Sequence, residues 1–172
     1  GTLEREANAV GSDARHRAAL IVERARLLEH REKRVDAALE LYETALRLDP
    51  HASGALEALE RLCHGQHRWR ELISVLERRA EQASDPNERA MALFRIGRLH
   101  LERLGNREEA LAAHERAAEE SPGDPLILEE LAGMLERSES WNRLVEVLSG
   151  LNLASSDPRE QLSLNHRIGN LL

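Results

Sequence analysis

The segment CHGQH at residues 63–67 brings together residue types that commonly bind zinc. Cys63, His64 and His67 could each supply one ligand, but a structural zinc ion needs four donors around one point. The segment lies in an expected turn between two helices, no second ligand cluster accompanies it, and Cys63 is the only cysteine. We therefore interpret Cys63 as a packing residue and the two histidines as turn residues, and we predict no metal site.

Two further histidines, His100 and His114, fall on the apolar columns of one expected helix pair. One hypothesis is that they are neighbours and form a pH-sensitive or metal-binding pair. The alternative, which we favour, is that both lie at the edge of the core and have hydrogen-bond partners there.

The sequence contains no motif that is typical of a catalytic site. No glycine-rich phosphate loop follows a strand, no nucleophile elbow occurs, and no His-Glu-x-x-His is present. Carboxylates are frequent, but we expect them on solvated helix faces, where no pocket would shift their pKa values. We predict a protein that is not an enzyme, without catalytic residues and without a cofactor.

The composition favours a helical protein that does not bind nucleic acid. Of the 172 residues, 41% are hydrophobic and 32% are charged, and alanine, leucine, glutamate and arginine are frequent. The formal net charge is −7, which disfavours binding to polyphosphate. The aromatic residues that could stack on bases are few, namely Tyr42, Trp69, Phe94 and Trp141.

Neither a membrane span nor an export signal is evident. No apolar run approaches the ~20 residues that cross a bilayer, and the N-terminus GTLEREANAV lacks the apolar stretch of a signal peptide. Together with the single cysteine, these features favour a cytoplasmic location. The chain begins at Gly1 and ends with IGNLL inside an expected helix, so we expect a segment of a longer protein.

The sequence repeats itself, and the clearest marks are the strings Ser-Asp-Pro at 84–86 and at 156–158. We call the shift that carries Ser84 onto Ser156 one full repeat. The same shift aligns further pairs, among them Leu27 with Leu99, Ala45 with Ala117, Pro50 with Pro122, Trp69 with Trp141, and Gly97 with Gly169. Each full repeat divides again, because Ala38, Leu72 and Ala110 occupy one column and lie about half a full repeat apart. Repeats of this length indicate stacked helix pairs.

Each half-repeat is predicted to form two helices. In DPNERAMALFRIGRLHLERL (85–104), Asp85 is the expected N-cap, Pro86 takes the first helical position, and Glu88 stands three residues after the cap. Apolar residues recur at intervals of three and four, and Gly105-Asn106 ends the helix. The same rules predict helices at about 14–31, 35–48, 52–64, 69–83, 86–104, 107–120, 125–137, 141–149 and 158–172.

A helix pair of this length, with small residues at fixed columns and a closing proline, resembles the tetratricopeptide repeat. The small residues of the pattern match Ala25, Gly97 and Gly169 in first helices and Ala38, Ala45, Ala110 and Ala117 in second helices, and Pro50 and Pro122 match the closing proline. Tyr42 matches the aromatic of the second helix, whereas His114 departs from it. Glu60 and Leu72 also depart, each standing where a small residue is expected.

The resemblance implies an all-α fold, a right-handed superhelical solenoid of antiparallel helix pairs. It covers residues 13–172 and leaves residues 1–12 as an N-terminal tail. The expected units are about 13–50, 51–84, 85–122 and 123–156, with a partial unit at 157–172. Trp69 and Trp141 share one column, so we predict that both are core residues; in an exposed position they would be binding anchors.

In this family the first helices line a concave groove that holds a partner's peptide. The matching columns imply contacts from Val22, Arg26, Glu57, Arg61, Met91, Phe94, Arg98, Leu101, Leu126 and Glu129. One column carries arginine in three successive units, and a ladder of guanidiniums would suit carboxylates or phosphates on a partner. The alternative is a solvated surface on which Glu29, Glu57 and Glu129 pair with these arginines.

The resemblance therefore implies a non-catalytic scaffold that binds a protein or peptide in its groove. The arginine column favours a partner with an acidic segment. The alternative is a structural segment of a larger protein, which self-associates through an exposed terminal repeat or regulates an attached domain. RNA binding by repeats of this length is disfavoured by the negative charge.

Overall fold

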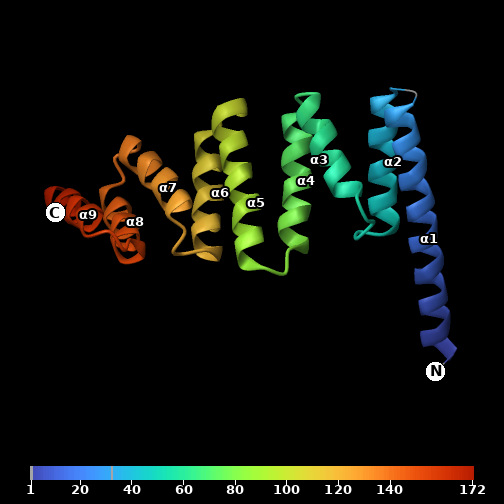
Figure 1. Cartoon of the computed structure of the whole chain (residues 1–172), viewed down its shortest axis with the longest axis horizontal. Helices are drawn as coiled ribbons and strands as arrows, with labels where there is room; N and C mark the ends of the chain where they lie inside the picture. The colour runs from blue at the N-terminus through green and yellow to red at the C-terminus, as the bar shows by residue number, and fades with distance from the viewer. Residues whose placement is uncertain (1, 32) are drawn as a thin grey trace. The chain divides into compact units, whose positions relative to one another are not determined.

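A computed structural model describes residues 2–31 and 33–172, with side chains from Ser12 onward within these ranges. In this part of the chain there are nine α-helices, one short π-helix and no strand (Figure 1). The helices are α1 (Thr2–His30), α2 (Val35–Leu48), α3 (Ala55–Gly65), α4 (Trp69–Gln82), α5 (Pro86–Leu99), the π-helix η1 (His100–Leu104), α6 (Arg107–Glu120), α7 (Pro125–Arg137), α8 (Trp141–Ala154) and α9 (Pro158–Leu171). They form two compact units; unit 1 ends at Val75 and unit 2 begins at Leu76, so the division falls within α4.

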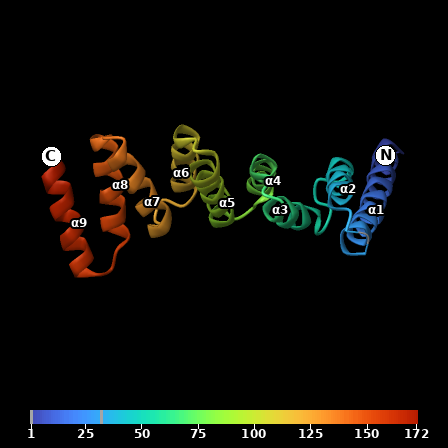
Figure 2. The same ribbon diagram turned by 90° about the horizontal axis from the view of Figure 1, so that it is seen from above.

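Unit 1 is built on the antiparallel pair α1 and α2, which lie side by side (Figure 2). Small residues allow this close approach, because Ala18 and Ala25 of α1 and Ala38 and Ala45 of α2 are fully buried. Tyr42 of α2 is fully buried as well and contributes a large aromatic ring to the core. Helix α3 then packs against α2, so that the apolar faces continue into the next pair.

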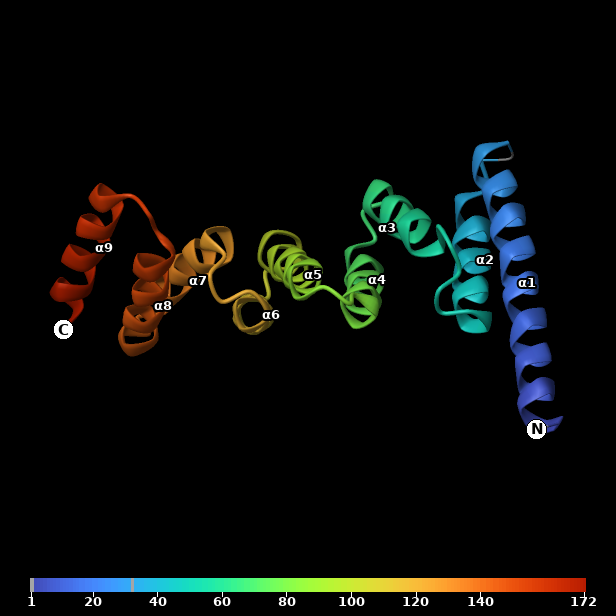
Figure 3. The same cartoon turned by 60° about the horizontal axis from the view of Figure 1, so that its bottom comes forward.

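Unit 2 contains the pairs α5–α6 and α7–α8, followed by α9, which packs against α8 (Figure 3). Its C-terminal core is almost entirely leucine and comes from all three of the last helices. The buried members are Leu128, Leu131, Ala132, Leu135, Leu144, Leu148, Leu151 and Leu164. Because this cluster is shared between α7, α8 and α9, no single pair could bury its own apolar face.

Three helices begin with the aspartate-proline signal that the sequence indicated. The Oδ1 atoms of Asp85, Asp124 and Asp157 accept hydrogen bonds from backbone amides two residues later, at 3.1, 2.9 and 3.0 Å. Proline follows each aspartate in the first turn of α5, α7 and α9. The predicted helix starts at 86, 125 and 158 are therefore confirmed, with the side-chain cap as their physical cause.

The turns within the helix pairs also recur at the interval of one full repeat. Lys33 and Gly105 have φ of +52° and +69°, and His67 and Glu139 have φ of +57° and +55°. The amide–carbonyl bonds that close these turns repeat too, joining Arg34 to Leu28, Asn106 to His100, Arg68 to Cys63, and Ser140 to Leu135. Two kinds of turn thus alternate along the chain, as the two kinds of half-repeat do in the sequence.

Three expectations differ from the structure. Helix α1 begins at Thr2 and not near residue 14, because Gly11, Ser12 and Asp13 continue the helix; one internal glycine costs a helix only about 1 kcal/mol. Helix α8 continues past Gly150 to Ala154 for the same reason. The prediction that Trp141 is a core residue is wrong: its side chain is 44% exposed at the start of α8. Trp69 in the matching column is half-buried.

The contact of α5 with α6 depends on Gly97. The imidazole of His114 is fully buried against it, and the Nδ1–H of His114 donates a hydrogen bond to the Ala110 carbonyl at 2.8 Å. A methyl group at Gly97 would overlap this ring and lie 3.1 Å from the Ala110 oxygen. Gly169 occupies the same column one full repeat later. A methyl group added at Gly169 would have no neighbouring side chain or helix within 4 Å.

We predict that Gly97→Ala lowers the free energy of unfolding by about 1–3 kcal/mol, since overpacking outweighs the gain in helix propensity. Gly169→Ala should instead raise it by up to about 1 kcal/mol, because that site is open. Urea denaturation followed by circular dichroism measures both changes. Equal effects of the two substitutions would show that His114 does not require the glycine.

Candidate functional site: the first-helix face

The predicted contact residues lie on the first helices of the pairs, which are α1, α3, α5, α7 and α9. In unit 1 they are Val22 and Arg26 on α1 and Glu57 and Arg61 on α3; in unit 2 they are Met91, Phe94 and Arg98 on α5, Leu101 on η1, and Leu126 and Glu129 on α7. Within each unit, the predicted contact residues thus come from the first helices of the pairs or, for Leu101, from the π-helix that follows one. We name the surface formed by these helices in each unit the first-helix face.

The predicted residues divide into exposed and buried ones. Met91 is 39% exposed and Leu126 is 51% exposed, which is unusual for large apolar side chains. Val22 and Phe94 are only 3% and 4% exposed, so they are core residues that offer a partner almost no surface. The ring of Phe94 packs against His114 with 5.1 Å between the ring centroids. Leu101 is half-buried, and the remaining five predicted residues are exposed.

Each of the three arginines in the predicted column binds a glutamate. The Arg26 guanidinium lies 2.7 Å from Glu23 on the same helix. Arg98 donates two hydrogen bonds to Oε1 of Glu102, at 2.8 and 2.6 Å. These exposed pairs correspond to the alternative of a salt-bridged surface, and Glu29, one of the expected partner glutamates, pairs with Arg61 of this column.

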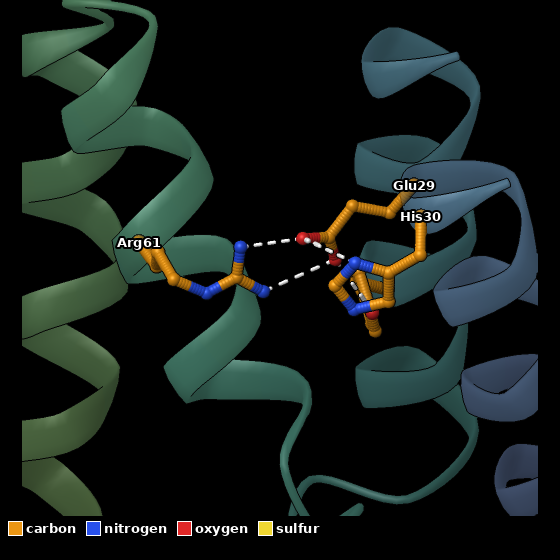
Figure 4. Close-up of polar contacts among 4 residues, drawn as sticks. Glu29, His30 and Arg61 are labelled. Atoms are coloured by element: carbon orange, nitrogen blue, oxygen red, sulfur yellow. Dashed lines mark hydrogen bonds and ion pairs between the residues drawn. The ribbon is translucent and has the colours of Figure 1, made fainter. Parts of the chain in front are cut away.

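Glu29 joins α1 to α3 through Arg61 (Figure 4). Both guanidinium nitrogens of Arg61 donate to the carboxylate, one of them at 3.1 Å, and the Tyr42 hydroxyl donates to it at 3.2 Å. The Glu29 side chain is only 7% exposed, whereas that of Arg61 is 56% exposed. Hydrogen bonds from Arg61 hold the pKa of Glu29 below its usual value, and burial beside this carboxylate raises the pKa of Tyr42 to about 12.

Unit 2 has no equivalent of this network among its described residues, because all three members change. One full repeat after Glu29, Tyr42 and Arg61 stand Leu101, His114 and Gly133. A leucine and a glycine cannot form an ion pair, and burial lowers the pKa of His114, which keeps its ring neutral. The first-helix face of unit 2 is therefore not bridged at this column.

An open pocket of about 310 Å³ lies on the first-helix face of unit 2, between α7 and α9. Its lining comes from α7, α8 and α9: Glu129, Ala132, Gly133, Leu151, Glu160, Ser163, Leu164 and Arg167. Ala132, Leu151 and Leu164 are buried core residues and form an apolar floor. The polar side chains stand around that floor, so the pocket combines an apolar base with a charged rim. We name it the α7–α9 pocket.

A second pocket, of about 440 Å³, lies between α4, α5 and α6. Its lining is mostly charged, with Glu77, Glu81, Glu119 and Glu120 beside Arg89 and Arg116. Arg89 crosses it, because its guanidinium binds Glu120 at 2.6 Å and the Ala83 carbonyl at 3.0 Å. The second helices α4 and α6 supply most of this lining, and none of the predicted contact residues belongs to it.

The CHGQH segment has a packing role. Cys63 is 1% exposed, and burial raises the pKa of its thiol to about 11. His64 and His67 both contact the Trp69 ring, with centroid distances of 5.5 and 5.1 Å. Within residues 2–31 and 33–172, no group of three or more histidine, cysteine, aspartate or glutamate side chains is arranged to hold a metal ion.

None of the contact residues predicted from the sequence lies on the α9 side of the α7–α9 pocket, which is formed by Glu160, Ser163, Leu164 and Arg167. The repeat could have indicated them, because Glu160 and Ser163 stand one full repeat after Glu88 and Met91 on the first helix α5. The predicted contact residues extend only as far as Glu129 of α7.

Comparison with known proteins supports the repeat architecture. A model of the tetratricopeptide repeat matches residues 55–90 and 92–126, two consecutive blocks of the expected length. These two segments of the chain are tetratricopeptide repeats. A search of curated protein sequences found no match.

Two solved structures have the same fold. One is pilF from Pseudomonas aeruginosa, 18% identical, with a TM-score of 0.52 over 90% of this chain and 68% of pilF. The other is YrrB, described as a tetratricopeptide repeat protein with an unusual peptide-binding site, 14% identical, with a TM-score of 0.52 over 90% of this chain and 86% of YrrB. The predicted class, an all-α solenoid of antiparallel helix pairs, is thereby confirmed. Among the described helices, none has the length and apolar character required to traverse a bilayer.

The Glu29 network predicts a pH dependence of stability. Because the pKa of Glu29 is lowered from 4.5 on folding, its contribution is present above pH 4.5 and is lost as the pH falls through the folded-state pKa. Glu29→Gln should lower the free energy of unfolding by about 1–2 kcal/mol at pH 7. The difference in unfolding free energy between the variant and the parent chain should shrink as the pH falls below the unfolded-state pKa of Glu29. Urea denaturation across this pH range measures it.

Glu23→Gln is the matched control, since Glu23 pairs with Arg26 on the exposed surface of the same helix. Its effect should stay below about 0.5 kcal/mol at every pH. A Glu29→Gln effect that is as large in acid as at neutral pH would show that the carboxylate charge is not responsible.

Proposed function

We propose that this chain is a non-catalytic scaffold that binds a segment of a partner protein along its first-helix face. Tetratricopeptide repeats generally mediate interactions between proteins, and matching repeats occupy residues 55–90 and 92–126. The observation that carries the proposal is the exposure of Met91 and Leu126, at 39% and 51%, on two first helices of unit 2. Burying large apolar side chains is the main source of binding energy in such contacts.

The arginine column has a smaller role in this proposal than the sequence suggested. Arg26, Arg61 and Arg98 each bind a glutamate of this chain, so a partner carboxylate would have to compete with an intramolecular one. Replacing one carboxylate by another at an exposed site yields little net energy. We propose that in unit 2 Arg98 orients a bound segment, while Met91, Leu126 and the α7–α9 pocket provide affinity.

The test uses random peptides displayed on phage and selected on the immobilised chain. A selected peptide, labelled with fluorescein, should bind the double variant Met91→Glu/Leu126→Glu at least about tenfold more weakly, because two apolar contacts are lost. Fluorescence polarisation measures affinity, and circular dichroism should show unchanged helix content.

Leu153→Glu is the matched control, since Leu153 is 86% exposed on the second helix α8. It should bind the peptide as the parent chain does. Selection of no peptide, or equal affinity of the double variant and the parent, would contradict the proposal.

A second candidate function is self-association through α1. Leu20 and Leu27 are 59% and 49% exposed, and their spacing of seven residues places both on one side of the helix. Two copies could bury these side chains against each other. Light scattering over a concentration series should then show a molecular mass that rises with concentration. The double variant Leu20→Glu/Leu27→Glu should have the mass of a monomer at every concentration. A constant monomer mass would exclude this candidate.

A further inference from the structure

We infer that the α7–α9 pocket takes a lysine or arginine side chain of the partner segment, an assignment that rests on the proposed function. This basic side chain contrasts with the acidic partner segment that the arginine column favoured in the sequence. Three features of the pocket favour such a side chain, namely its shape, the glycine at its wall and the charges on its rim.

The shape suits a long side chain with an apolar stem. Ala132, Leu151 and Leu164 form the floor and are 3%, 4% and 7% exposed. A volume of about 310 Å³ is sufficient for one long side chain and part of its backbone. Lysine and arginine lay their methylene groups on apolar surface while the charged end stays near polar groups.

Gly133 keeps the pocket open. It occupies the column that Arg61 fills one full repeat earlier, where the guanidinium is bound to Glu29. At Gly133 a methyl group would meet only the Arg137 guanidinium, at 3.8 and 3.9 Å. The column that presents an arginine in unit 1 therefore carries no side chain in unit 2, which leaves room beside Gly133 for the stem of a partner side chain.

The charges around the pocket complete the assignment. Glu129 and Glu160 stand on opposite helices of the rim, and no side chain in the described part of the chain forms a hydrogen bond or an ion pair with Glu129. Glu160 accepts one hydrogen bond, from the Ser155 hydroxyl at 2.5 Å, and keeps further acceptor capacity.

The positive groups lie toward the C-terminal half of α7. The Arg167 guanidinium lies 3.5 Å from Glu136, and Arg137 lies over Gly133. The lining thus carries two carboxylates, Glu129 and Glu160, against one guanidinium, Arg167, which already lies near Glu136. An ammonium or a guanidinium of a partner would bind to this excess of negative charge.

The experiment uses the peptides selected by display on the full chain. We expect lysine or arginine to be enriched among them, and we expect replacement of that residue by methionine to weaken binding about tenfold. The variant Glu129→Gln/Glu160→Gln retains the size of both side chains. It should bind the basic peptide about tenfold more weakly than the parent chain does, and it should bind the methionine analogue with unchanged affinity. Gly133→Arg should abolish binding of the basic peptide, because it fills the pocket and adds a positive charge.

Two controls match these variants. Gly123→Arg adds the same residue in the turn before α7, where no atom stands within 4 Å of a new side chain's first carbon. Glu146→Gln removes an exposed carboxylate on α8. Both should bind as the parent chain does, and thermal unfolding should show that Gly133→Arg remains folded.

The outcomes separate this assignment from the proposed function. If selected peptides depend on Met91 and Leu126 but carry no basic residue, or are indifferent to Glu129→Gln/Glu160→Gln and Gly133→Arg, the scaffold function stands and the pocket assignment is wrong. If no peptide is selected, the proposed function itself fails.

Discussion

The close approach of two antiparallel helices through small residues is the constraint on which the pairs α1–α2 and α5–α6 depend. In α1 and α2 the contact is made by fully buried alanines, Ala18, Ala25, Ala38 and Ala45. Alanine allows the backbones to approach, and the larger leucines then fill the space between successive pairs. Where Gly97 replaces Ala25 in the next repeat, the space it leaves is taken by the imidazole of His114. The two helices still pack closely at this point, although Gly97 stands in place of Ala25 and His114 in place of Tyr42.

The same scaffold carries two different first-helix faces. In unit 1 a buried carboxylate, Glu29, binds Arg61 and Tyr42, so the polar groups of that column satisfy one another. In unit 2 the matching residues are Leu101, Gly133 and His114, and the face opens as the α7–α9 pocket. Packing residues and surface residues therefore change independently, because each hairpin needs only its small and apolar columns to stack.

Local signals explain which parts of the fold could be predicted. Asp85, Asp124 and Asp157 cap their helices as expected, since cap, proline and apolar period act within a few residues. The full repeat was visible in side chains and reappears in the left-handed turn residues Lys33 and Gly105. The N-terminal boundary was less predictable, because helix propensity alone does not stop a helix at one glycine.

By itself, the sequence determined the helical class, the starts of the three helices that follow an Asp-Pro, and the alternation of two kinds of pair, because these depend on neighbours along the chain. Only the tertiary structure decided which side chains remain accessible. Phe94 was expected on the surface and is buried, whereas Trp141 was expected in the core and is exposed. The ion pair of Glu29 with Arg61 and the pocket beside Gly133 likewise depend on helices that meet in space. Burial is decided by what packs against a residue, and the repeat column does not specify it.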